Sequence, residues 1–176
     1  MPVKLNKNNT VVTFQKISNL DSRSNQEANV VNALKAEKLE TEKVVDNQLS
    51  ILDVKELKGL HLQSNNFKTL PLKVDQCIHL KYLSLENNQI ELLPESFCDL
   101  TALRCLRLES NRIKCLPKAF SKLSQIESLS LSRNKLKALP NNIGSLRKLE
   151  ILYASDNNLI SLPESFSDLV ALKWVF

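Results

Sequence analysis

Residues 128–140 read SLSLSRNKLKALP and combine two different patterns. The first half alternates Leu129 and Leu131 with polar residues, which is typical of a short strand with one buried face. The alternation stops at Asn134, and Pro140 closes the stretch. A lone strand gives no reason for this asparagine and proline, so the explanation must come from the surrounding sequence.

The same pattern returns every 23 residues in both directions along the chain. Residues 59–71 read GLHLQSNNFKTLP, residues 82–94 read YLSLENNQIELLP, and residues 105–117 read CLRLESNRIKCLP. Residues 151–163 read ILYASDNNLISLP. A fixed period of roughly 20–50 residues indicates a solenoid built from stacked repeats.

Each repeat combines a strand pattern with a second apolar set that follows the proline. The repeats start at Leu57, Leu80, Leu103, Ile126, Leu149 and Leu172. The pattern LxxLxLxxNxL followed by LPxxF/IxxL resembles the leucine-rich repeat in its 23-residue form, with five full repeats over residues 57–171. The resemblance implies an α/β solenoid, a leucine-rich repeat horseshoe with a parallel concave β-sheet and short helical or irregular convex segments.

The resemblance also explains the asparagine. A chain that leaves a strand through a tight corner buries backbone polar groups, and each group left unpaired costs roughly 1–3 kcal/mol. An asparagine side chain offers both a donor and an acceptor. The family uses stacked asparagines to satisfy this corner, and the same role is implied for Asn65, Asn88, Asn111, Asn134 and Asn157. The proline then ends strand pairing at the start of the returning segment.

Three regions follow from this pattern. Residues 1–24 are polar and predict a disordered arm. Residues 25–56 predict an N-terminal helix, marked by the capping-box pattern Ser24 to Glu27, and a degenerate half-repeat that caps the first coil. A helix that binds a partner is the alternative for this region. Residues 57–176 predict the leucine-rich repeat array, in which the sixth repeat is incomplete.

Composition narrows the function classes. The net charge of +5 is too mild to indicate nucleic-acid binding, and no apolar run is long enough for a membrane span. The start of the chain lacks the apolar segment of a signal peptide, and the four cysteines form no CxxC pair. We therefore expect an intracellular, cytoplasmic protein with reduced thiols. Neither histidine has ligand spacing to a cysteine, so no metal or other cofactor is expected.

Catalysis finds no support in the sequence. The chain has no glycine-rich phosphate loop and no nucleophile beside a plausible base. Cys105 is expected on the concave face, but His61 lies two strands away, which is roughly 10 Å by strand spacing. We therefore predict that the protein is not an enzyme.

Function in such an array is expected at the outward strand positions of the concave sheet, because the leucines, asparagines and prolines only build the fold. These positions hold residue types that are enriched at protein interfaces, with acidic partners beside them. The predicted protein-binding residues are Tyr82, Glu86, Arg107, Glu109, Tyr153 and Trp174. A plain repeat surface that tolerates stray aromatics is the alternative.

A second candidate surface lies just past the strands. Basic residues from adjacent coils form a predicted basic rim that can steer an acidic partner or simply keep the protein in solution. The rim consists of Arg112, Lys114, Arg133, Lys135 and Lys137.

The 23-residue, LP-containing form of the repeat resembles that of the soc-2/Ras-suppressor and Erbin/Scribble scaffolds. The resemblance concerns this class of repeat.

The resemblance implies an interaction scaffold in small-GTPase signalling, with a Ras-type small GTPase or a phosphatase subunit as partner. The alternative from another class of function is a substrate-recognition or regulatory fragment of a larger enzyme complex such as a ubiquitin ligase.

The chain ends at the sixth strand, so much of the apolar layer of Leu159, Leu162, Phe166 and Leu169 is expected to stay exposed to water, beside Trp174 and Phe176. The uncapped C-terminal end leads to two alternative expectations: the chain self-associates through this end, or it is a truncated product whose full-length form continues the array.

Overall fold

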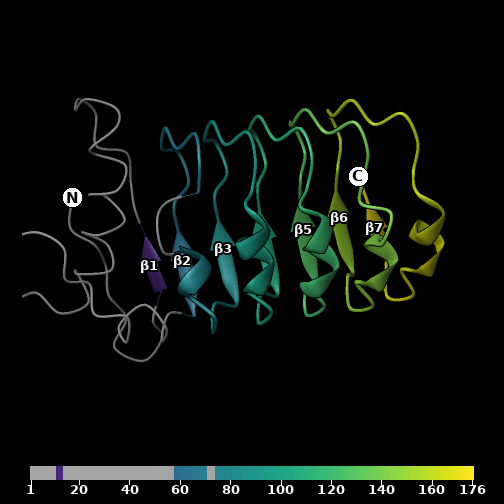
Figure 1. The fold of residues 1–176 in the computed structure, drawn as a ribbon, viewed down its shortest axis with the longest axis horizontal. Coiled ribbons are helices and arrows are strands. Elements are labelled where there is room, and N and C mark those ends of the chain that lie inside the picture. The colour runs from purple at the N-terminus through teal and green to yellow at the C-terminus, as the bar shows by residue number, and fades with distance from the viewer. Residues whose placement is uncertain (1–10, 14–57, 71–73) are drawn as a thin grey trace, which may run out of the picture.

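The computed structural model describes residues 11–13, 58–70 and 74–176 as a row of stacked coils (Figure 1). Seven parallel strands lie side by side in chain order: β1 (Val11–Thr13), β2 (Gly59–His61), β3 (Tyr82–Ser84), β4 (Cys105–Arg107), β5 (Ser128–Ser130), β6 (Ile151–Tyr153) and β7 (Trp174–Val175). From β2 onward, each strand pairs with the residues 23 positions later, for example Leu106 with Leu129. The expected leucine-rich repeat solenoid with a parallel concave sheet is confirmed.

Short 3-10 helices return the chain from the end of each strand to the next coil. They are η1 (Val74–Gln76), η2 (Glu95–Asp99), η3 (Lys118–Lys122), η4 (Ile143–Ser145) and η5 (Glu164–Asp168). The repeated proline directly precedes η2, η3 and η5, and its carbonyl oxygen accepts the first helical hydrogen bond. Phe97 N–H, for example, donates to the Pro94 oxygen at 3.0 Å, and Phe120 N–H donates to the Pro117 oxygen at 3.1 Å. In η4 the residue before the helix is Asn142.

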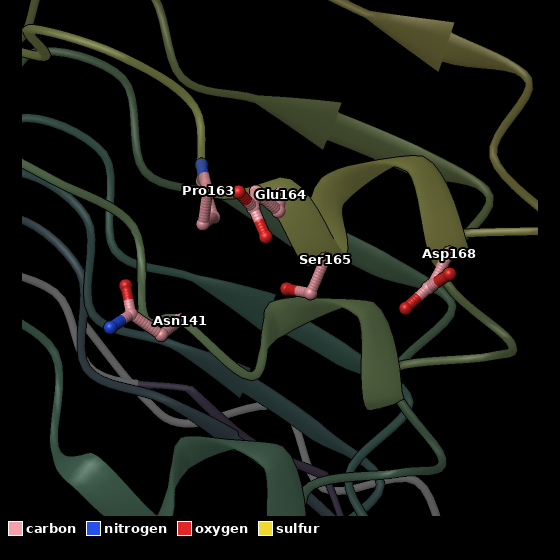
Figure 2. A pocket seen from close by; sticks show the side chains of 5 residues that line it. All are labelled: Asn141, Pro163, Glu164, Ser165 and Asp168. Atoms are coloured by element: carbon pink, nitrogen blue, oxygen red, sulfur yellow. The ribbon is translucent and has the colours of Figure 1, made fainter.

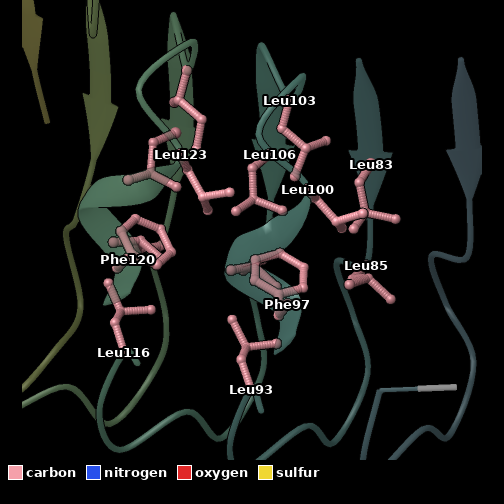
Figure 3. Close-up of a cluster of buried hydrophobic side chains, with 14 of the residues drawn as sticks. Leu83, Leu85, Leu93, Phe97, Leu100, Leu103, Leu106, Leu116, Phe120 and Leu123 are labelled. Carbon is pink, nitrogen blue, oxygen red and sulfur yellow. The ribbon is translucent and has the colours of Figure 1, made fainter. Parts of the chain in front are cut away.

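The core is one continuous apolar layer between the strands and the helices (Figure 3). Inward strand residues such as Leu83 and Leu106 are fully buried, and Phe97 and Phe120 cover them from the helical side. The coils share this layer, so no coil has a closed core of its own.

The asparagine ladder forms the corner after each strand. Asn134 Nδ2 donates to the carbonyl oxygens of Leu131 in its own coil and Leu108 in the preceding coil, both at 2.9 Å. Its Oδ1 accepts from the Ile113 N–H at 2.9 Å. Asn88, Asn111 and Asn157 make the same three bonds, and Asn65 donates to two carbonyl oxygens. The predicted role of the asparagines is confirmed.

The same corner contains a feature that the sequence did not indicate. The residue before each ladder asparagine has a left-handed backbone, with φ between 53° and 57°, although none is glycine: Ser64, Asn87, Ser110, Arg133 and Asp156. Four of their N–H groups donate to a carbonyl of the next coil, as Ser110 does to Ser132 at 3.0 Å. Stacking therefore holds a conformation that is unfavourable for an isolated residue.

The N-terminal end differs from the predicted organisation in one strand. Residues 11–13, placed in a polar arm by the sequence, form β1 and pair with β2. The predicted helix and half-repeat at 25–56 lie outside the described residues, so the N-terminal cap stays a prediction.

At the other end, Leu162 is 53% exposed, as expected, but Leu169 is only 6% exposed. The expectation for Leu169 was wrong, because Leu172 already packs against the core beside it.

Candidate protein-binding face

Four of the six predicted interface residues lie on the outward side of strands β3, β4, β6 and β7, and Glu86 and Glu109 follow β3 and β4. Because side chains alternate along a strand, the residues beside the buried leucines point to the open, concave face. Tyr82, Arg107 and Tyr153 occupy these positions in β3, β4 and β6, and Trp174 occupies one in β7. Figure 1 shows these strands next to one another, so the sheet brings residues far apart in sequence onto one surface.

One group of charged and aromatic residues spans β3 and β4. The Arg107 guanidinium lies 3.8 Å from the Glu86 carboxylate, measured from Nη1 to Oε1, and 5.7 Å above the Tyr82 ring centroid. Ser84 donates a hydrogen bond to the same carboxylate. Burial raises the pKa of the Tyr82 phenol, so the hydroxyl stays protonated at neutral pH. The three predicted residues Tyr82, Glu86 and Arg107 thus form one pre-arranged cluster.

The next strand, β5, carries only small outward side chains. Above Ser128 and Ser130 lies a hollow of about 420 Å³, which is also lined by Glu86, Arg107, Glu109, Ile151 and Tyr153. The larger residues of β4 and β6 form its two walls. Sequence reasoning named four of the lining residues but missed Ser128, Ser130 and Ile151. The run of serines at outward positions of one strand was the signal that could have found them.

The C-terminal part of the face is aromatic. The Tyr153 ring stacks on Phe176, with ring centroids 4.9 Å apart and an interplanar angle of 14°. Tyr153 is 39% exposed, Trp174 60% and Phe176 57%. Phe176 was not among the predicted site residues, although it belongs to the same outward column of the repeat.

The structure brings the basic rim together and partly neutralises it. The loops carrying Arg112 and Lys135 lie in adjacent coils, and all five rim residues are exposed. Lys114 pairs with Glu91 at 2.8 Å, and Arg133 pairs with Asp156 at 3.5 Å. Within the described part of the chain, Arg112, Lys135 and Lys137 have no ion pair.

The rim's charge also acts on Glu91. The hydrogen bond and charge of Lys114 hold the pKa of the Glu91 carboxyl below its usual value, with smaller contributions from Arg112 and Lys135. The rim is therefore a cationic edge with one firmly ionised carboxylate inside it.

A second hollow, of about 540 Å³, lies on the convex side between the last two full coils (Figure 2). Asn141 faces it from one coil, and Pro163, Glu164, Ser165 and Asp168 line it from the other. Gly144 permits the close approach of these coils here, because a Cβ atom on it would lie 2.0 Å from the Ser165 carbonyl oxygen. The neighbouring polar groups serve coil packing, as the hydrogen bond from Gly144 N–H to Ser165 Oγ shows.

Two of the four cysteines, Cys77 and Cys98, are buried. Burial raises the pKa of the Cys77 thiol to about 12 and that of Cys98 to about 11, so both stay protonated at neutral pH. Among the described residues, no three His, Cys, Asp or Glu side chains gather in a way that could hold a metal ion. The absence of enzymatic activity and of a cofactor stays a prediction.

Comparison with known proteins identifies the repeat. The sequence pattern of the leucine rich repeat family matches residues 55–113 and 116–159, which is more than half of the chain. The chain belongs to the leucine-rich repeat family. Leucine-rich repeat arrays are generally protein-interaction modules rather than enzymes. No curated protein sequence matches the chain.

Solved structures of leucine-rich repeat proteins share the fold. An internalin from Listeria monocytogenes is 25% identical with a TM-score of 0.62, and the match covers 74% of this chain and 38% of the internalin. The ectodomain of the Arabidopsis thaliana membrane receptor kinase GASSHO1/SCHENGEN3, solved with CASPARIAN STRIP INTEGRITY FACTOR 2, is 28% identical with a TM-score of 0.62, over 69% of this chain and 15% of the ectodomain.

A third match is a leucine-rich repeat protein from Leptospira interrogans, at 27% identity and a TM-score of 0.58, over 80% of this chain and 43% of that protein. This leucine-rich repeat chain thus spans less than half the length of each of the three. No helix in the described ranges has the length and apolar character needed to cross a membrane.

Proposed function

We propose that this leucine-rich repeat chain binds a protein partner through its concave face. The observation that carries the proposal is the continuous surface from Tyr82 and Arg107 on β3 and β4 to Tyr153 on β6, which combines an aromatic–guanidinium cluster with an open hollow. Tyrosine, tryptophan and arginine dominate the energetics of protein interfaces. Glu86 and Glu109 beside them set the polarity of the surface.

The aromatic end strengthens this choice of face. Trp174 and Phe176 are more than half exposed, and large aromatic side chains exposed side by side favour association with another protein surface. The basic rim adds a cationic edge just past the strands. The charges of Arg112, Lys135 and Lys137, which no carboxylate of the described residues neutralises, are available to attract acidic groups of the partner.

The proposal extends to a cytoplasmic scaffold in signalling, with a Ras-type small GTPase or a phosphatase subunit as partner. It is supported by the 23-residue repeat pattern that the chain has in common with the soc-2/Ras-suppressor and Erbin/Scribble scaffolds. The alternative, a substrate-recognition fragment of a larger complex such as a ubiquitin ligase, uses the same concave face. A second copy of the chain is a further proposed partner, through the apolar C-terminal end.

Affinity purification with mass spectrometry identifies the partner, and titration calorimetry on the purified pair tests the face. We expect Arg107→Ala and Tyr153→Ala each to weaken binding by more than about 1 kcal/mol, because truncating a central interface anchor has at least this cost. Lys122→Ala on the convex helix η3 is the matched control and should bind like the parent. Full binding by both concave variants, together with loss of binding by the convex one, would refute the proposal. If the purified complexes contain no small GTPase, the proposed role in small-GTPase signalling is wrong, but the proposed binding face is not affected.

A further inference from the structure

The hollow over β5 is a gap in an otherwise large-residue surface. Ser128 and Ser130 form its floor because a serine side chain ends one atom beyond Cβ. Arg107 on β4 and Tyr153 on β6, the neighbours of Ser130 in the parallel register, rise on either side of it. A hollow of this kind, about 420 Å³ and open to solvent, can receive a long side chain from a partner.

The charged residues around the hollow differ in whether they already have a partner. Arg107 is already paired with Glu86 and lies over the Tyr82 ring. Within the described ranges, the Glu109 carboxylate has neither an ion pair nor a side-chain hydrogen bond. The lining contains two carboxylates and one guanidinium, so its formal charge is negative, although the whole chain carries +5.

The opposite wall is apolar and aromatic. Ile151 lines it together with the Tyr153 ring, which is held in place by stacking on Phe176 at 4.9 Å. A fixed, partly exposed tyrosine ring attracts a cation and also packs against an aliphatic chain.

We infer that this hollow receives a lysine or arginine side chain of the protein partner, with its charged end at Glu109 and its aliphatic stem against Ile151 and Tyr153. An acidic side chain meets two carboxylates and a guanidinium that is already paired. A purely apolar side chain removes water from Glu109 without replacing it, which is unfavourable for a charged group. The basic side chain alone satisfies both walls. The inference rests on the proposed function and deepens it by giving the chemistry of the partner's anchor.

A randomised dodecapeptide library displayed on phage, selected on the immobilised full chain, tests the inference and needs no identified partner. We expect the selected peptides to contain a lysine or arginine on which binding depends. In the synthetic peptide, replacing this residue by norleucine should weaken binding at least tenfold, measured by titration calorimetry.

Two variants of the chain locate the anchor. Glu109→Gln keeps the shape of the side chain and removes its charge, so it should weaken binding about tenfold and reduce the dependence on salt. Ser130→Leu fills the floor and should abolish binding, with circular dichroism showing that the fold is retained. Glu164→Gln on the convex side removes an equal charge and should leave the affinity unchanged.

The outcomes separate this inference from the proposed function. Peptides that respond to Tyr153→Ala and Arg107→Ala but not to Glu109→Gln, or whose binding depends on an acidic residue, overturn the inference and leave the concave face in use. Peptides insensitive to all concave variants overturn both. A selection that yields no peptide dependent on a basic residue also overturns the inference.

Discussion

The coil at residues 103–125 and the last full coil at 149–171 have the same pattern of leucine, asparagine and proline, yet differ in how deeply these residues are buried. In the inner coil Leu116 is 8% exposed and Phe120 is fully buried. In the last coil Leu162 is 53% exposed, and Phe166 is only partly buried. The motif therefore fixes where a side chain points, whereas the following coil decides how much of it leaves water.

The asparagine ladder shows the same contrast. Asn111 and Asn134 are each 7% exposed, whereas Asn157 keeps its three hydrogen bonds in a partly exposed position. Water can replace the partners of Asn157 but not those of Asn134. In a linear array, nearest-neighbour contacts carry much of the stability, so equal motifs need not contribute equally.

The largest expected effect tests the difference in burial of apolar side chains between the inner coil and the last full coil. Leu106→Ala, in the fully buried centre, should lower the free energy of unfolding by about 2–5 kcal/mol, because it removes buried methyl groups and leaves a cavity. Leu162→Ala, at a half-exposed site, should cost less than about half of that. Chemical denaturation followed by circular dichroism measures both. Equal losses would show that the last coil is covered as fully as the inner ones.

The second prediction tests the difference in burial between two asparagines of the ladder, Asn134 and Asn157. Asn134→Ala leaves the Ile113 N–H and the Leu108 and Leu131 carbonyls without their side-chain partner in a buried corner. We expect a loss of about 1–3 kcal/mol in the free energy of unfolding. Asn157→Ala should lose less than Asn134→Ala, because water reaches its corner. If the two variants unfold at the same denaturant concentration, burial is not the source of the difference.

The smallest expected effect concerns association through the open end. The exposed aromatic residues of β7 and the apolar surface beside them, together with a strand edge that faces no further strand among the described residues, favour pairing between copies. Light scattering on the chain at about 100 μM should show a concentration-dependent rise in mass, since large exposed apolar patches are rare on soluble monomers. Trp174→Ser combined with Phe176→Ser should abolish the rise.

A stable monomer whose mass is the same with and without these substitutions contradicts end-to-end pairing. Lys122→Ser on the convex side is the matched control and should associate like the parent.

The 23-residue periodicity was enough to predict the repeat, its register and the roles of its buried residues. Alternation around Leu129, the position of Asn134 and the position of Pro140 each have a local physical cause, and repetition at 23 residues removed the ambiguity that a single short strand would leave. The outward columns also followed from the register, which is why the sequence alone placed Tyr82 and Tyr153 on one face.

The contacts among these outward residues could not be predicted from the sequence and depend on how the coils stack. The pairing of Arg107 with Glu86, the stacking of Tyr153 on Phe176 and the hollow above Ser130 all join side chains from different coils. The left-handed backbone at Arg133 and the close approach of two coils at Gly144 also depend on neighbouring coils, so the sequence of a single repeat does not predict them. Periodicity specifies direction within a coil, but distances, ion pairs and cavities arise from the size and charge of the neighbouring coils.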